Sequence, residues 1–303
     1  MAWKVRLIAG AILTCLFVAL YSQSHLPVPK GREHAGNSQS AIGDDGRRRR
    51  KNGDNHQDVL AVIVPFRNRF EELQTFAPYI HGFLNRQHIP HLIFIVNQVD
   101  KYRFNRAALI NVGFKYAKNQ STYMVMHDVD LLPLNRNLSY KKPGKAHVMH
   151  VAAPGLHPKY DYPTFIGGIL IISNEDFAKV NGMSNLYWGW GLEDDEFYVR
   201  LKNADMKVAR PTVTTSKSNT FEHIHATRPR DMTKCFDQYN KTRKRDRMTG
   251  LRNVNYTLVS TTRIVIQDTP LTVLNVQLKC DFQMSPWCDC SKQRPNTTIT
   301  AKT

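Results

Sequence analysis

Between Val59 and Asp128 the chain alternates short apolar runs with longer amphipathic stretches, and this alternation restricts the fold more than any other feature. The apolar runs 59–64, 91–96 and 123–127 have the length and the β-branched content of buried strands. The stretches 71–83 and 105–117 between them predict helices, the first despite Pro78. Strands and helices in this order are typical of an α/β domain with a parallel sheet.

The same reading continues toward the C-terminus. We expect a strand ending at Ser173, a short helix at 174–180 capped by Ser173 or Asn174, and a helix at 193–203. Strand-like segments follow at 208–214, 220–225, 257–267 and 271–278. A chain of 303 residues, 42% of them hydrophobic, suits one large catalytic domain, which we place at 58–303.

The N-terminal segment predicts an address in the secretory pathway. Lys4 and Arg6 precede an apolar run at 7–21, which is either a cleaved signal peptide or an uncleaved membrane anchor. No Ala-x-Ala site follows the run, which favours the anchor. We therefore expect a cytoplasmic tail at 1–6, a transmembrane signal-anchor at 7–21, a flexible stem at 22–57 and a lumenal domain after it.

Cysteines and glycosylation triplets agree with a lumenal domain. Beyond the apolar run the cysteines are four in number, which suits two disulfides whose pairing the sequence leaves open: Cys235, Cys280, Cys288 and Cys290. Cys288 and Cys290 lack the CxxC spacing of a zinc knuckle. Asn-x-Ser/Thr triplets begin at Asn119, Asn137, Asn240, Asn255 and Asn296.

The formal net charge is +17, which fits solubility, nucleic-acid binding or a basic cleft for phosphate-bearing ligands. Part of the excess lies in one run, 47–51, inside the expected stem. We therefore expect no nucleic-acid partner.

Two pairs of side chains predict a metal site. Asp128 and Asp130 follow the third strand, where alternation would place both carboxylates on one face, so that they need a cation or strong hydrogen bonds. His223 and His225 have the same spacing, and alone they fit two surface histidines. Together with Asp130 they form an oxygen-and-nitrogen ligand set that suits Mn²⁺ better than Mg²⁺.

The segment Trp188-Gly189-Trp190-Gly191 precedes four consecutive acids, 193–196, at the start of a predicted helix. Complementarity to the helix dipole explains one or two of these acids but not the tryptophans and glycines. Glycine allows close backbone approach to a ligand, and tryptophan stacks on the apolar face of a sugar. The pattern predicts a sugar platform with a general base beside it.

Several other side chains could line the same crevice, because ligands bind beyond the carboxyl ends of parallel strands. Arg67 and Arg69 suit diphosphate oxygens, although solvated loop arginines fit the pattern equally well. Phe104 and Arg106 could face a base and a phosphate. Tyr160 and Tyr162 could line an acceptor site or belong to the core.

Taken together, these motifs are closely similar to the β-1,4-galactosyltransferase family. The matching stretches, in the family's order between 62 and 231, are Val64 to Arg69, Phe104 to Ala107 with Asn111 to Phe114, His127 to Asp130, Phe165 to Gly168, and Trp188 to Asp195. His223-Ile224-His225 and Glu196-Phe197 look most like the xylose-specific branch, whereas many other members have methionine where His223 stands.

The resemblance implies a GT-A fold with a mixed, mainly parallel central sheet, UDP-galactose as donor, and a xylosylated core protein as acceptor in the Golgi. It implies that Asp130, His223 and His225 hold Mn²⁺ and that Asp194 is the catalytic base. The donor contacts it implies are Arg67, Arg69, Phe104, Arg106, Asp128, Val129, Trp190 and Glu193. The acceptor contacts are Tyr160, Tyr162 and Asp195. An N-acetylglucosamine acceptor and a catalytically silent carbohydrate-binding protein are the alternatives.

Overall fold

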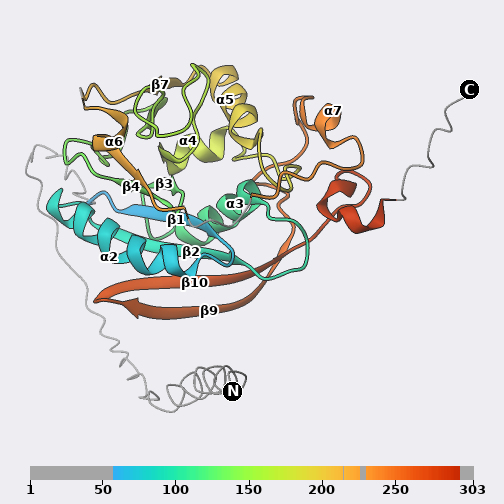
Figure 1. The fold of residues 1–303 in the computed structure, drawn as a ribbon, viewed down its shortest axis with the longest axis horizontal. Helices are drawn as coiled ribbons and strands as arrows, with labels where there is room; N and C mark the ends of the chain where they lie inside the picture. Colours follow the sequence, from blue (N-terminus) through green and yellow to red (C-terminus); the bar gives the residue numbers. More distant parts are fainter. Residues whose placement is uncertain (1–56, 214, 226–229, 294–303) are drawn as a thin grey trace, which may run out of the picture. The chain divides into compact units, whose positions relative to one another are not determined.

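The computed structural model describes residues 57–293 except 214 and 226–229 (Figure 1). Its strands are β1 (Leu60–Phe66), β2 (His91–Gln98), β3 (Tyr123–His127), β4 (Leu131–Pro133), β5 (His147–His150), β6 (Ile169–Ser173), β7 (Lys207–Ala209), β8 (Phe221–His223), β9 (Tyr256–Ile266) and β10 (Thr269–Leu278). Its helices are α2 (Phe70–Arg86), α3 (Arg106–Ala117), α4 (Asn174–Lys179), α5 (Glu193–Asn203), α6 (Lys217–Thr220) and α7 (Gln238–Thr242), with 3₁₀ turns at Pro286–Cys288 and Cys290–Lys292.

The central sheet has eight strands in the order β7-β5-β6-β3-β1-β2-β10-β9. Strand β1 pairs in parallel with both β2 and β3, which confirms the expected α/β core. Strands β10 and β7 also pair in parallel, with β2 and β5. The pairs β3–β6, β5–β6 and β9–β10 are antiparallel, so the sheet is mixed.

Alternation along β1 divides the core between the two faces of the sheet. Leu60, Val62 and Val64 pack in one cluster with α2, and Ala61 and Ile63 pack in another with α3. All of these side chains are fully buried. A strand that is covered on both faces reads as a continuous apolar run, which is why the run at 59–64 stands out in the sequence.

Two predicted segments differ from the structure. The strand expected at 208–214 is limited to β7, and the strand expected at 220–225 is limited to β8. One helical turn, α6, precedes β8, and the Thr220 hydroxyl donates a hydrogen bond to the Ser216 carbonyl oxygen at 2.7 Å. The strands β4 and β5 and the helix α7 were not predicted, because three to five residues are too few to display a periodicity.

The four cysteines between 235 and 290 form two disulfides, as expected. Cys235 bonds to Cys290 and Cys280 bonds to Cys288, with Cα–Cα distances of 5.8 and 6.1 Å. Within the described ranges, no helix combines the length and the apolar character that crossing a bilayer requires. The expected tail, anchor and almost the whole stem lie outside the described residues.

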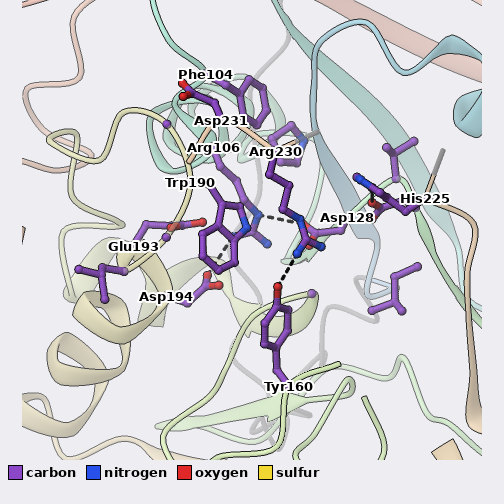
Figure 2. Close-up of a pocket in the computed structure, with 18 of the residues that line it drawn as sticks. Phe104, Arg106, Asp128, Tyr160, Trp190, Glu193, Asp194, His225, Arg230 and Asp231 are labelled. Carbon is purple, nitrogen blue, oxygen red and sulfur yellow. Dashed lines mark hydrogen bonds and ion pairs between the residues drawn. The ribbon is translucent and has the colours of Figure 1, made fainter. Parts of the chain in front are cut away.

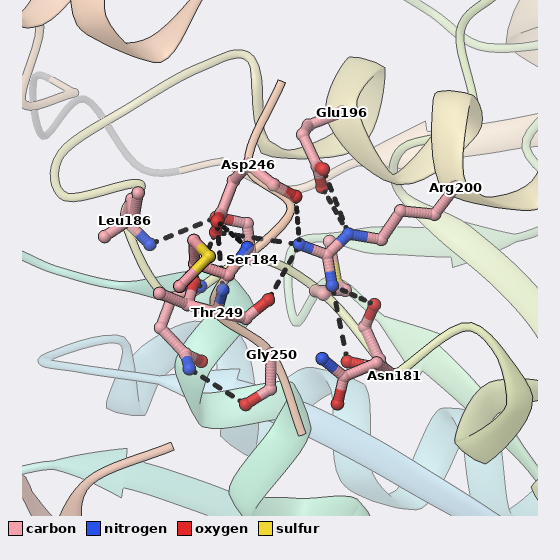
Figure 3. Close-up of polar contacts among 12 residues, drawn as sticks. Asn181, Ser184, Leu186, Glu196, Arg200, Asp246, Thr249 and Gly250 are labelled. Atoms are coloured by element: carbon pink, nitrogen blue, oxygen red, sulfur yellow. Dashed lines mark hydrogen bonds and ion pairs between the residues drawn. The ribbon is translucent and has the colours of Figure 1, made fainter. Parts of the chain in front are cut away.

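A buried ion cluster connects α5 to Gly182 and to the segment 246–249 (Figure 3). The Arg200 guanidinium pairs with Glu196 at 2.9 Å and with Asp246 at 3.6 Å. It also donates to the carbonyl oxygens of Gly182 and Thr249, at 3.1 and 2.8 Å. These contacts fix the helix whose first turn carries the four acids.

Replacing Arg200 with methionine is expected to lower the free energy of unfolding by about 3–5 kcal/mol, because Glu196 and Asp246 would remain buried without their cation. Denaturant unfolding followed by tryptophan fluorescence measures this change. Lys202→Met on the same helix is the control, since Lys202 is exposed and should change stability by less than about 0.5 kcal/mol. Equal effects of the two variants would contradict the structural role of the cluster.

Candidate active site

One cavity of about 530 Å³ collects the predicted site residues from elements far apart in the sequence (Figure 2). Its lining includes all of the residues predicted to bind the metal, the donor and the acceptor, together with Asp194. The cavity lies beyond the carboxyl ends of β1 and β3, where parallel sheets bind their ligands. The role of each lining residue stays a prediction.

Asp130, His223 and His225 form a three-sided ligand set. One ligand atom from each of them lies within 4.8 Å of the others. His225 Nδ1 is 2.7 Å and His223 Nε2 is 3.6 Å from Asp130 Oδ2. The small antiparallel pair β4–β8 brings the three together, because it places Leu131 opposite His223, and the Ile224 amide donates to the Asp130 carbonyl oxygen at 2.9 Å.

The protonation states of this set suit a cation. Burial lowers the pKa of His223, which keeps its imidazole neutral and able to coordinate. Burial would raise the pKa of Asp130, but its hydrogen bond to His225 and the nearby positive charges outweigh burial and lower it. One carboxylate with two imidazoles fits Mn²⁺, and the three side chains leave coordination positions open for phosphate oxygens.

Asp128 has a different partner from Asp130, whereas strand alternation predicted both carboxylates on one face. Strand β3 ends at His127, so Asp128 and Asp130 lie in a turn where strand alternation no longer applies. Arg106 pairs with Asp128 at 2.8 Å and with Asp194 at 3.0 Å, and it bridges the two carboxylates (Figure 2). Burial, together with the charges of Asp130 and Asp194, raises the pKa of Asp128 to about 6.

The tryptophan-glycine turn has the backbone that its sequence predicts. Gly189, Gly191 and Leu192 have φ values of 82°, 105° and 72°, a left-handed conformation that favours glycine. The turn leaves Trp190 39% exposed at the cavity and starts α5 with its acidic first turn. A side chain at Gly167 would collide with the Asp194 carboxylate, so this glycine makes room for the predicted base.

The surroundings of Glu193 favour its protonated form. Burial and then the charge of Asp194 raise the pKa of Glu193 from 4.5 to about 8. The folded protein therefore holds a proton between pH 4.5 and 8 that the unfolded chain releases, and stability falls as the pH rises through this window. A protonated Glu193 can donate a hydrogen bond to a sugar oxygen.

We expect Glu193→Gln to remove this pH dependence. A shift of this size corresponds to about 5 kcal/mol, and solvent access to the half-buried side chain reduces the expected effect to about 2 kcal/mol. The measurement is denaturant unfolding of the metal-free protein and the variant at about pH 5 and about pH 8. The free energy of unfolding of the variant, relative to that of the unsubstituted protein, should increase as the pH rises. An equal pH dependence of the two proteins would contradict the raised pKa.

The predicted acceptor tyrosines lie at one end of the cavity. The Tyr160 hydroxyl accepts a hydrogen bond from Arg230 Nη1 at 2.6 Å, and the Tyr160 ring lies 6.3 Å from that of Trp190. Tyr162 is hydrogen bonded to Asp195. Both tyrosines therefore contact residues of the site and do not belong to the core.

The lining residues that the sequence analysis missed include His157 and Arg230. His157 Nδ1 accepts from the backbone amides of Lys159 and Tyr160, at 3.0 Å each, and thereby fixes the backbone before both tyrosines. Its place in the run His157-Pro158-Lys159-Tyr160, three residues before a predicted acceptor tyrosine, could have marked it. Arg230 lies in an irregular basic segment, and no periodicity distinguishes it from its neighbours.

Arg67 and Arg69 line the cavity, and both make polar contacts within the protein. Arg67 donates to the carbonyl oxygens of Gln98, Tyr102 and Asp100, at 3.3, 2.6 and 3.0 Å. Arg69 pairs with Glu72 at 2.9 Å. In this structure Arg67 therefore supports the loop after β2, and the predicted diphosphate contacts of both arginines stay predictions.

Comparison with known proteins agrees with this geometry. Residues 23–143 match the family model for the N-terminal region of glycosyl transferase group 7, and residues 147–224 match the model described as the N-terminal domain of galactosyltransferase. Drosophila melanogaster β-1,4-galactosyltransferase 7 is 54% identical over 235 residues, which are 77% of this chain and 73% of that protein. The Caenorhabditis elegans xylosylprotein 4-β-galactosyltransferase is 47% identical, covering 76% and 81%.

Solved structures give the same result. The catalytic domain of Drosophila β-1,4-galactosyltransferase 7 in complex with xylobiose has a TM-score of 0.76 and 53% identity, covering 77% of this chain and 99% of that one. A mutant of the same enzyme, solved with manganese, UDP-Gal and xylobiose, also has a TM-score of 0.76, at 52% identity. The domain therefore has the GT-A fold, and the chain belongs to the β-1,4-galactosyltransferase family.

Proposed function

We propose that this chain is an Mn²⁺-dependent, inverting β-1,4-galactosyltransferase that moves galactose from UDP-galactose to a xylose on a core protein. The observation that carries the proposal is the convergence of the Asp130–His223–His225 set, the Trp190 turn and Tyr160 on one cavity. The Drosophila relative solved with manganese, UDP-Gal and xylobiose supports the same donor, metal and sugar for this chain.

The chain's own residues would act as follows. Asp194, in the first turn of α5, accepts the proton of the acceptor 4-hydroxyl as that oxygen forms a bond to the anomeric carbon of galactose. The bond from that carbon to the phosphate breaks, UDP leaves with the electron pair, and the configuration inverts. Trp190 stacks on a sugar face, and Tyr160, Tyr162 and Asp195 orient the acceptor.

The donor end follows from the same lining. Arg106 and Glu193 would contact the galactose and the phosphates of the donor, and the other donor contacts proposed from the lining are Phe104, Arg67, Arg69, Asp128 and Val129. Asp130, His223 and His225 would hold Mn²⁺, which stabilises the negative charge of the departing diphosphate when it is bound. Burial of these groups strengthens each electrostatic contact.

We also propose that the chain is a single-pass type II protein of the Golgi membrane, anchored by residues 7–21, with residues 58–303 in the lumen. The two disulfides support an oxidising compartment. Replacing the apolar run with a cleavable signal sequence should release the active domain into the medium.

A donor and acceptor panel tests the proposed activity. Purified protein is incubated with Mn²⁺, UDP-galactose or other UDP-sugars, and β-xylosides or β-N-acetylglucosaminides, and the products are assigned by NMR. The expected product is galactose linked β-1,4 to xylose, formed only with UDP-galactose and a divalent metal. Preference for N-acetylglucosaminides, or xyloside binding without transfer, would contradict the proposal.

A further inference from the structure

The segment 234–247 carries six cations that we call the basic surface, of which Lys234 lines the cavity: Lys234, Lys241, Arg243, Lys244, Arg245 and Arg247. All six side chains are exposed. Among the described residues, none of them forms an ion pair. Uncompensated charge at this density repels itself, so a counter-charged ligand would stabilise it.

The acids of the same segment are largely neutralised by arginines from elsewhere. Asp231 pairs with Arg103 at 2.6 Å. Asp246 is buried and faces Arg200 (Figure 3). Of the three acids between 231 and 247, only Asp237 remains exposed without an ion pair in the described structure. The exposed side chains of this segment therefore carry a net positive charge.

The basic surface reaches the cavity through Lys234. Lys234 lines the cavity, as does Arg230, which donates to the Tyr160 hydroxyl. Lys234 Nζ and the Arg243 guanidinium lie 4.6 and 3.9 Å from the centre of the same ring, that of Tyr239. Positive charge is thus present in the cavity lining, at Arg230 and Lys234, and continues past Tyr239 to Arg243.

The segment that carries these cations is fixed to the site. Gln238 Nε2 donates to the Trp188 carbonyl oxygen at 2.8 Å, which ties the start of α7 to the tryptophan-glycine turn. The disulfide between Cys235 and Cys290 secures the same segment from the other side. The start of this segment, at 235–238, is therefore held in a set position relative to the tryptophan-glycine turn.

We infer that the basic surface binds acidic side chains of the polypeptide that carries the acceptor xylose. The inference rests on the proposed function, because a xylose bound at Tyr160 would bring its polypeptide to the mouth of this cavity. Exposed charge pairs each contribute little, but several together raise encounter rates and lower KM. The acceptor polypeptide is brought to the cavity by its xylose, whereas an unrelated polyanion is not.

The test compares two xylosylated peptides that differ only in flanking residues, aspartate and glutamate in one, asparagine and glutamine in the other. The enzyme is the deglycosylated full domain with Mn²⁺ and UDP-galactose, because Asn240 begins a glycosylation triplet at this surface. One variant replaces Lys241, Arg243, Lys244, Arg245 and Arg247 with glutamine. The control removes five exposed lysines outside the cavity, Lys118, Lys141, Lys145, Lys179 and Lys207.

At low salt the unsubstituted enzyme should have a kcat/KM about tenfold higher for the acidic peptide, through KM. The basic-surface variant and about 0.5 M salt should abolish the difference, and the control variant should retain it. A small xyloside should react equally with all three proteins, and failure to react with it would refute the proposed function instead. Equal use of both peptides by the unsubstituted enzyme would overturn the inference. The inference would also be overturned if the basic-surface variant kept the preference for the acidic peptide. The same holds if the variant lost only its binding to heparin or anionic vesicles and used both peptides as the unsubstituted enzyme does.

Discussion

Replacing Asp194 with asparagine is expected to lower kcat for galactose transfer about 10³-fold. Asparagine keeps the shape of the side chain, and its amide oxygen can still accept from Arg106, 3.0 Å away in the structure. It cannot accept the proton of the acceptor hydroxyl, so only the chemical step should suffer. UDP-galactose affinity, measured by calorimetry with Mn²⁺, should stay within about twofold.

Asp195→Asn is the matched control for this prediction. Asp195 is the next residue of the same helix turn, is half-buried, and is hydrogen bonded to Tyr162. Its replacement should raise KM for the acceptor more than it lowers kcat. Transfer by the Asp194→Asn protein within about tenfold of the original rate would exclude Asp194 as the base.

Removing one ligand of the Asp130–His223–His225 set is expected to have the second large effect. Asp130→Asn deletes the only carboxylate of the set, and His225→Ala deletes a nitrogen 2.7 Å from it. Because a cation that bridges a diphosphate needs anionic as well as neutral ligands, both variants should bind Mn²⁺ at least about 10²-fold more weakly. The rate of galactose transfer should fall together with the affinity for Mn²⁺.

The spectrum of bound Mn²⁺, measured by electron paramagnetic resonance with UDP present, reports this loss directly. His88→Asn serves as the control, since His88 is exposed, lies outside the cavity and has a φ of 54° that asparagine tolerates. Unchanged Mn²⁺ affinity in Asp130→Asn would show that the cation is held elsewhere.

The helices and strands that position this site could be predicted, because their sequences carry strong local patterns. The bounds of α5 are those expected, since the four acids at 193–196 complement the dipole at a helix N-terminus and Arg200 and Lys202 complement it in the last turn. The side chain of Asn105 accepts from the Ala108 amide at 2.9 Å, which explains the predicted start of α3. Resemblance to a family then supplied roles that local patterns do not contain.

What the sequence did not predict depends on contacts between distant segments. The bridge from Arg106 to Asp128 and Asp194 joins residues 22 and 88 positions apart, and nothing local marks it. The pairing of Cys235 with Cys290 spans 55 residues and is one of several possible connections. The pair β4–β8 has three residues in each strand, yet it aligns the metal ligands.

The central claim is that one cation and one acceptor sugar meet in this cavity, and paramagnetic relaxation by Mn²⁺ tests it most directly. The Asp194→Asn protein, which should bind both substrates without turnover, is mixed with UDP, Mn²⁺ and a β-xyloside, and proton relaxation of the xyloside is recorded. We predict strong Mn²⁺-dependent relaxation, greatest at the C4 proton and absent when Asp130 is also replaced. A xyloside that binds without such relaxation would contradict the account.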